Sequence, residues 1–143
     1  MSPEFYTPEL ANRSLPLVRA IVSDVVALTG RVTEAHDAYA ALREQPDRPQ
    51  IALNEARARI AEMTASRDAC LAELEGLGVL LGDATRGICD FPAEVDGAPV
   101  VLCWELGEAR VEWYHGRDER HDTTSTRADG VRRRPLELAV TAS

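Results

Sequence analysis

The stretch VVLCWELGEARVEWYH, residues 100–115, gathers side chains from which protein sites are often built. It contains Cys103, Glu108 and His115. A cysteine and a histidine can ligate zinc, and a histidine beside a glutamate can transfer protons. Asp90 precedes the stretch, and Arg134 follows it in a run of three arginines that could hold a carboxylate or phosphate. These five residues are the candidate ligand-binding residues.

Two long helices are predicted to carry the first half of the chain. Thr7 suits an N-cap, and apolar residues at gaps of three and four then predict a helix over 8–44 with a kink near Pro16. The segment QPDRP interrupts this pattern, and Asp47 could cap a second helix over 48–81. The apolar residues of this second helix have a mean spacing of 3.5 residues, which is typical of a coiled coil. A short proline-containing loop between two helices with apolar stripes of similar length predicts an antiparallel helical hairpin.

The second half of the chain has the composition of strands. Residues 87–115 predict a three-stranded antiparallel β-meander with turns at Asp96-Gly97 and Gly107-Glu108. Residues 116–129 are polar and predict a loop or insert, and 130–143 form a tail. The expected fold is therefore α+β, a single domain over 1–143 with the long hairpin packed on the small meander.

The two turns also predict which side chains share a face of the sheet. The first turn places Asp90 opposite Cys103, and a two-residue second turn would place Glu112 opposite Cys103. His115 would then lie on the other, apolar face, at its rim. Cys103 and His115 could share a zinc ion only if a β-bulge shifted one strand, so we expect no metal site. Two carboxylates beside the thiol would also disfavour a nucleophilic thiolate.

Charge and composition narrow the class of partner. The net charge of −8 and the pI near 4.9 argue against nucleic acid and anionic membranes. No apolar run approaches the roughly 20 residues of a membrane span. The three cysteines have no CxxC spacing, which argues against a disulfide framework or zinc ribbon. We expect a cytoplasmic protein with reduced thiols and no cofactor.

Several motifs together resemble the uncharacterised bacterial family catalogued as domain of unknown function 2203. The similarity lies in YTPELANRSLPLVRAIV, in GICDFPAEVDGAPVVLCWELGE, in VEWYH and in GVRRRPL. The chain departs from the family at Tyr114, where tryptophan is usual, at Val131, where an aromatic is usual, and in the longer link before Gly130. The resemblance implies that six residues occupy family positions: Asp90, Cys103, Trp104, Glu108, His115 and Arg134. It implies the fold and no particular activity.

Two functions remain open at this point. The first is an interaction or assembly module that forms a homodimer through leftover helical surface or binds an unidentified protein partner. The second is a small-ligand site or enzyme at the mouth between sheet and helices. There His115 and Glu108 would transfer protons and Arg134 would hold an anion. Because nucleotide loops, nucleophile elbows and HExxH motifs are absent from the sequence, we favour the first function over catalysis.

Overall fold

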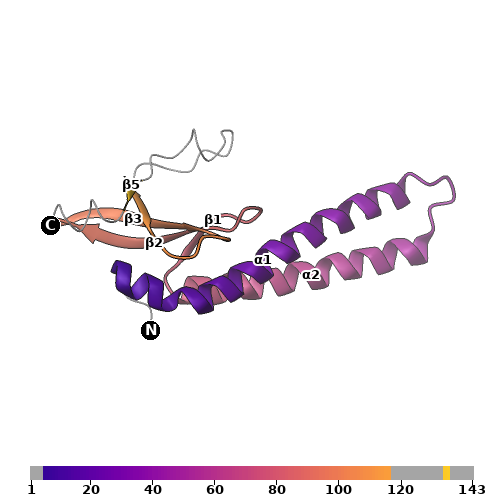
Figure 1. The fold of residues 1–143 in the computed structure, drawn as a ribbon. Helices are drawn as coiled ribbons and strands as arrows, with labels where there is room; N and C mark the ends of the chain where they lie inside the picture. The colour runs from indigo at the N-terminus through magenta and orange to yellow at the C-terminus, as the bar shows by residue number, and fades with distance from the viewer. Residues whose placement is uncertain (1–4, 117–133, 136–143) are drawn as a thin grey trace.

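A computed structural model describes residues 5–116 and 134–135 of the chain. The helices α1 (Pro8–Arg43) and α2 (Gln50–Gly76) form an antiparallel hairpin beside an antiparallel sheet (Figure 1). The strands lie in the order β1 (Leu80–Asp83), β2 (Ile88–Val95), β3 (Ala98–Glu105), β4 (Trp113–Gly116) and β5 (Arg134–Pro135). The predicted α+β fold is confirmed, with the predicted meander as β2, β3 and β4. Strands β1 and β5 extend the sheet at its two edges beyond the prediction.

The helix ends follow local chemistry. The Thr7 hydroxyl accepts a hydrogen bond of 3.1 Å from the Leu10 amide, so the predicted N-cap of α1 is confirmed. Helix α1 runs as one helix through Pro16. Helix α2 has Pro49 at its N-cap position without a side-chain cap, so the predicted cap at Asp47 is wrong. It ends at Gly76 and not near residue 81, because Gly78 takes a φ of 78° and turns the chain into β1.

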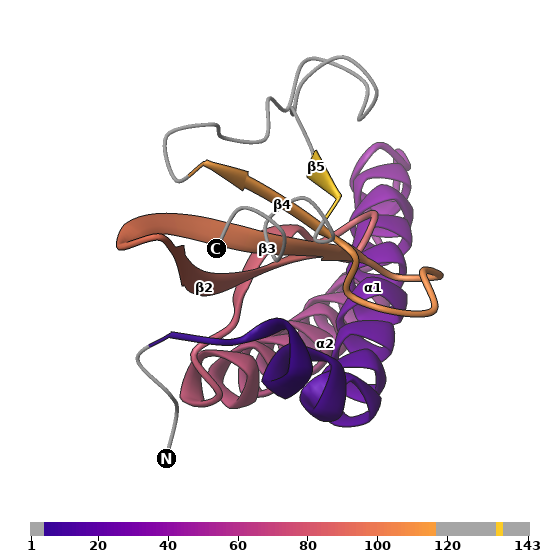
Figure 2. The same cartoon turned by 60° about the vertical axis from the view of Figure 1, so that its left-hand side comes forward.

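The sheet covers only one half of the hairpin. The strands lie over the part of the hairpin where α1 starts and α2 ends (Figures 1 and 2). Side chains from β2 and β3 pack there with both helices in one hydrophobic core. The largest fully buried members include Trp104, Phe91, Leu74 and Val18. The other half of the hairpin extends beyond the sheet, and its helices bury side chains against each other. Neither helix is apolar enough along its length to cross a membrane.

The first β-hairpin has the predicted register and the second does not. Strands β2 and β3 pair Val95 with Ala98 and Asp90 with Cys103, around Asp96 and Gly97, both with positive φ. Strands β3 and β4, however, pair Cys103 with Trp113 rather than with Glu112. A connection of residues 106–112 joins them in place of a two-residue turn.

A contact from α1 explains the longer connection. The Val111 amide donates a hydrogen bond of 2.8 Å to Asn12 Oδ1, and the Val111 carbonyl accepts one of 3.2 Å from Asn12 Nδ2. Because Asn12 satisfies both backbone groups of Val111, this residue stays out of the strand ladder while its side chain remains in the core. The resulting shift of one residue turns every side chain of β4 to the face opposite to the predicted one.

Candidate metal centre

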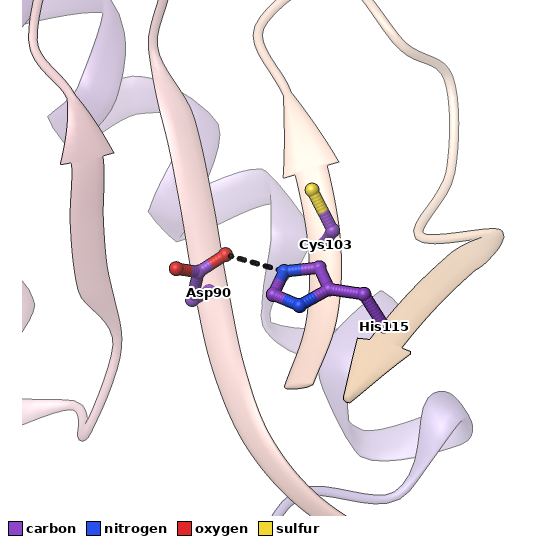
Figure 3. Close-up of side chains that lie close together, drawn as sticks. All are labelled: Asp90, Cys103 and His115. Atoms are coloured by element: carbon purple, nitrogen blue, oxygen red, sulfur yellow. Dashed lines mark ion pairs between the residues drawn. The ribbon is translucent and has the colours of Figure 1, made fainter. Parts of the chain in front are cut away.

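Three neighbouring strands bring Asp90, Cys103 and His115 together on the face of the sheet that points away from the helices. Asp90 lies opposite Cys103 on β2 and β3, and His115 lies opposite Val101 on β3 and β4. One ligand atom from each of the three side chains lies within 4.8 Å of the other two. Figure 3 shows the Asp90 carboxylate facing one ring nitrogen of His115, with the Cys103 side chain next to the ring. We call these three residues the DCH cluster.

The DCH cluster contradicts two predictions. His115 is not on the helix-facing side of the sheet with Cys89, and the expected separation of Cys103 from His115 is wrong. Both errors come from the register of β4. The expected rim position of His115 is also replaced by a buried one, because only 2% of the residue is exposed. Cys103 is equally buried, and Asp90 retains 18% exposure of its side chain.

The two ring nitrogens of His115 have different partners. Nδ1 lies 2.9 Å from the Gly116 carbonyl oxygen, and Nε2 lies 3.6 Å from Asp90 Oδ1. Since a carbonyl oxygen only accepts, Nδ1 carries a proton and donates it in this bond. Nε2 is therefore the nitrogen that faces the cluster. It can carry a second proton toward Asp90 or offer a lone pair to a metal ion.

Hydrogen bonding favours the protonated form of His115 when only protons compete for Nε2. Burial alone would lower the pKa of the imidazole. Hydrogen bonding to the Asp90 and Cys103 side chains and to the Gly116 carbonyl outweighs burial and raises the pKa to about 10. Cys89 lies on the opposite face, where burial, Asp90 and Cys103 raise its thiol pKa to about 12. Cys89 is therefore a core thiol, and Cys103 is the thiol of the cluster.

The arrangement suits a metal ion better than a nucleophilic triad. In a cysteine–histidine–aspartate triad, one ring nitrogen takes the thiol proton and the other donates to the aspartate. Here Asp90 lies beside Nε2, and the backbone occupies Nδ1. Donors of three kinds instead lie within 4.8 Å of one another. Ligating histidines in metal sites commonly donate their other nitrogen to a backbone carbonyl in this way.

The remaining predicted site residues lie apart from the cluster. The Glu108 carboxylate accepts a hydrogen bond of 2.7 Å from the Glu105 amide in the connection after β3, and the Glu108 carbonyl accepts one from Trp104 Nε1. Glu108 therefore shapes this connection. Arg134 pairs through its backbone with Tyr114 at the sheet edge. Within residues 5–116 and 134–135, the group of potential metal ligands consists of Asp90, Cys103 and His115.

Residues 116–129 and the tail, which were predicted as a polar loop and a C-terminal segment, lie almost entirely outside the described residues. The site residue that sequence reasoning missed is Asn12, which fixes the connection before β4. Its signal was its place in the segment YTPELANRSLPLVRAIV, where the polar amide of Asn12 directly follows the small apolar residue Ala11. Ala11 before it is fully buried, so Asn12 lies next to the core.

Comparison with known proteins agrees with the motifs from which the resemblance was first drawn. No curated protein and no solved structure is significantly similar to the chain. The family model described as "Uncharacterized conserved protein (DUF2203)" matches residues 4–123, a range that includes Asn12 and the whole DCH cluster. The chain therefore belongs to the DUF2203 family of conserved proteins.

Proposed function

We propose that this protein binds one divalent transition-metal ion of the zinc class through Asp90, Cys103 and His115. The observation that carries the proposal is the convergence of a carboxylate, a thiol and an imidazole within 4.8 Å of one another on three adjacent strands. Zinc accepts oxygen, sulfur and nitrogen donors at about 2.0–2.3 Å. The helical hairpin would then serve as the scaffold that holds the sheet.

The distances support a tetrahedral ion. Bonds of this length at tetrahedral angles place donor atoms roughly 3.3–3.7 Å apart. Asp90 Oδ1 and His115 Nε2 already lie 3.6 Å apart. The other separations are at most 4.8 Å, so the cluster needs side-chain shifts of up to roughly 1.5 Å to enclose an ion. Asp90, the least buried member, has the freedom to make them.

The chemistry of the donors supports a borderline-soft metal. A thiolate and an imidazole select zinc, cobalt or ferrous iron over magnesium and calcium, which prefer oxygen. An ion would also replace the proton on His115 Nε2 as the positive charge beside Asp90. We therefore expect metal binding to release protons from the imidazole and the thiol.

The test is metal stoichiometry and affinity. The protein would be purified without chelators, its zinc content measured by elemental mass spectrometry, and the metal-free form titrated with zinc. Cys103→Ser, His115→Ala and Asp90→Ala should each weaken zinc binding at least about 10–100-fold, as even loss of a residue that only supports a ligand does. Cys70→Ser and His36→Ala are matched controls, because these residues lie on the helices.

The proposal fails if the wild-type protein and Cys103→Ser bind zinc with the same affinity. It also fails if zinc binds but is lost in the control variants and retained in the cluster variants. Circular dichroism of each variant would show that the helices and sheet are intact. Lost binding in a folded variant is then attributable to the missing ligand.

Assembly through the hairpin is a second candidate function, and it is favoured by the half of the hairpin that extends beyond the sheet (Figure 1). Near its tip the apolar side chain of Ile51 is 77% exposed and is available for contact with a second chain. We propose that this arm forms a coiled-coil homodimer or binds a protein partner in the cytoplasm. Native mass spectrometry should show a dimer that Ile51→Gln dissociates. A monomeric wild-type protein would refute the homodimer.

A further inference from the structure

The DCH cluster also indicates how a bound metal ion would be held and how it would leave. We infer that the ion is enclosed by the sheet, braces β4 against β2, and exchanges with solution only when β4 separates from β3. This inference rests on the proposed metal binding and adds the regulation of that site. It assigns the ion a structural role and assigns Asn12 the control of its exchange.

The first observation is the burial of two of the three donors. His115 and Cys103 are 2% and 1% exposed, and the Asp90 side chain is 18% exposed. An ion bound to all three would meet water only on the side of Asp90. If Asp90 alone released it, the ion would still be bound to a thiolate and an imidazole that lie out of water. A chelator in solution therefore cannot remove the ion until these two donors move.

The second observation is that the two buried donors come from different strands. Cys103 is on β3 and His115 is on β4, where it pairs with Val101 of β3. Separation of β4 from β3 would pull the imidazole away from the thiol and break the site. Asp90 lies on β2, on the other side of β3, so the ion would join two strands that are not neighbours. The ion pair of 3.6 Å between Asp90 and His115 makes the same link in the metal-free protein.

The third observation is that β4 is the least anchored of the three strands that carry the donors. Strands β2 and β3 pair along eight residues, whereas β4 pairs with β3 along four and with β5 along two. Segments with few contacts open at lower free energy than the core of a fold. The contact of Asn12 with Val111 ties α1 to the chain two residues before β4. Asn12 therefore sets how readily β4 opens, and with it the rate of metal exchange.

The rate of zinc release tests this inference. Zinc-loaded protein would be mixed with the chromogenic chelator pyridylazoresorcinol, and the absorbance of the zinc complex followed over time. The release rate should be the same at every saturating chelator concentration, because opening of β4 is the slow step. Asn12→Ala should release zinc at least about tenfold faster, which is the effect of losing one buried hydrogen-bond partner. Asn54→Ala, a change at an exposed position of α2, should release zinc at the wild-type rate.

Two measurements on the wild-type protein do not depend on the stability of a variant. Urea below the unfolding transition should accelerate zinc release, because opening of β4 exposes surface to solvent. Amide hydrogen exchange followed by mass spectrometry should show that zinc slows exchange in residues 113–116. Exchange in residues 51–60, at the far end of the hairpin from the sheet, should not change.

The possible failures are distinct. Release that accelerates in proportion to chelator concentration, or that does not respond to urea, would show that the ion is reached in the closed sheet. Either result overturns this inference and leaves zinc binding intact. Wild-type release rates in a folded Asn12→Ala protein would refute the control by Asn12, and unchanged exchange in residues 113–116 would refute the brace. If the wild-type protein binds no zinc in the titration, the proposed metal site fails, and this inference fails with it.

Discussion

Replacing Asn12 with alanine should destabilise the whole domain, although Asn12 lies on a helix near one end of the chain. The substitution removes the two hydrogen bonds of 2.8 and 3.2 Å to the backbone of Val111, a residue only 2% exposed. Each buried backbone group left without a partner costs about 1–3 kcal/mol. The higher helix propensity of alanine returns roughly 0.5 kcal/mol. Two such groups cost about 2–6 kcal/mol, so the net loss should be about 1.5–5.5 kcal/mol.

Thermal unfolding followed by circular dichroism measures this loss. For a chain of 143 residues, each kcal/mol lowers Tm by about 3–4 °C, so Asn12→Ala should melt roughly 5–22 °C below the wild type. Asn54→Ala is the matched control. Asn54 is an exposed residue of α2 that accepts a hydrogen bond from Gln50 one turn away, and its loss should change stability by less than about 0.5 kcal/mol.

The same variant should lose zinc affinity at temperatures where it remains folded. Without the Asn12–Val111 contact, residues 106–112 are free to shorten, and β4 can shift along β3. A shift of one residue would move His115 to the helix-facing side, away from Asp90 and Cys103. If Asn12→Ala has wild-type stability and wild-type zinc affinity, the contact does not set the register, and our account of the site is wrong.

Three further outcomes follow from the described residues. Gly87→Ala should destabilise the fold by about 2–4 kcal/mol in denaturant unfolding, because φ is +74° and a Cβ would lie 2.8 Å from that of Leu106. Gly97→Ala, with φ of +77° and open space around it, should cost only about 1–2 kcal/mol, and equal losses would contradict the steric explanation. Burial raises the pKa of the Tyr6 hydroxyl above its ordinary 10.0, and a hydrogen bond with Ser14 partly opposes this shift. The free energy of unfolding should therefore fall as pH rises above 10, because the unfolded chain loses the Tyr6 proton first. When unfolding is measured as a function of pH, Tyr6→Phe should not show this decrease. Zinc at 100 times its wild-type Kd should stabilise the metal-free protein by about 2.7 kcal/mol, reversibly with a chelator, and the same addition should stabilise Cys103→Ser by no more than about 1.4 kcal/mol.

Local patterns were sufficient for the presence and antiparallel pairing of the two helices and for the first β-hairpin. The stripe from Leu15 to Leu42 lies against α2, as its spacing predicts, because burial of one face decides the orientation of a helix. Asp96-Gly97 specifies a two-residue turn through the positive φ of both residues, and the register of β2 and β3 follows from it. In both cases the determining residues are neighbours in sequence.

The candidate site could not be predicted in the same way. Gly107 and Glu108 resemble a two-residue turn, but Glu108 bonds to the Glu105 amide and Asn12 holds Val111, so the connection is longer. The decisive contact joins residues 99 positions apart, and no periodicity within the second half of the chain contains it. The end of α2 was misplaced for a related reason, because Leu77 and Leu81 continue the helical spacing into a segment that pairs with β2.

The Asn12–Val111 contact also has a consequence for the order in which the molecule assembles. The helical hairpin and the pairing of β2 with β3 need only contacts between nearby segments, which form early. The contact of Asn12 with Val111 closes a loop of 99 residues, and that of Tyr6 with Leu77 closes one of 71. Closing such long loops costs more chain entropy and comes later. During synthesis, Asn12 on the N-terminal helix can form these hydrogen bonds only after the chain has been made as far as Val111. We expect capacity to retain metal to be among the last properties that the folding chain acquires.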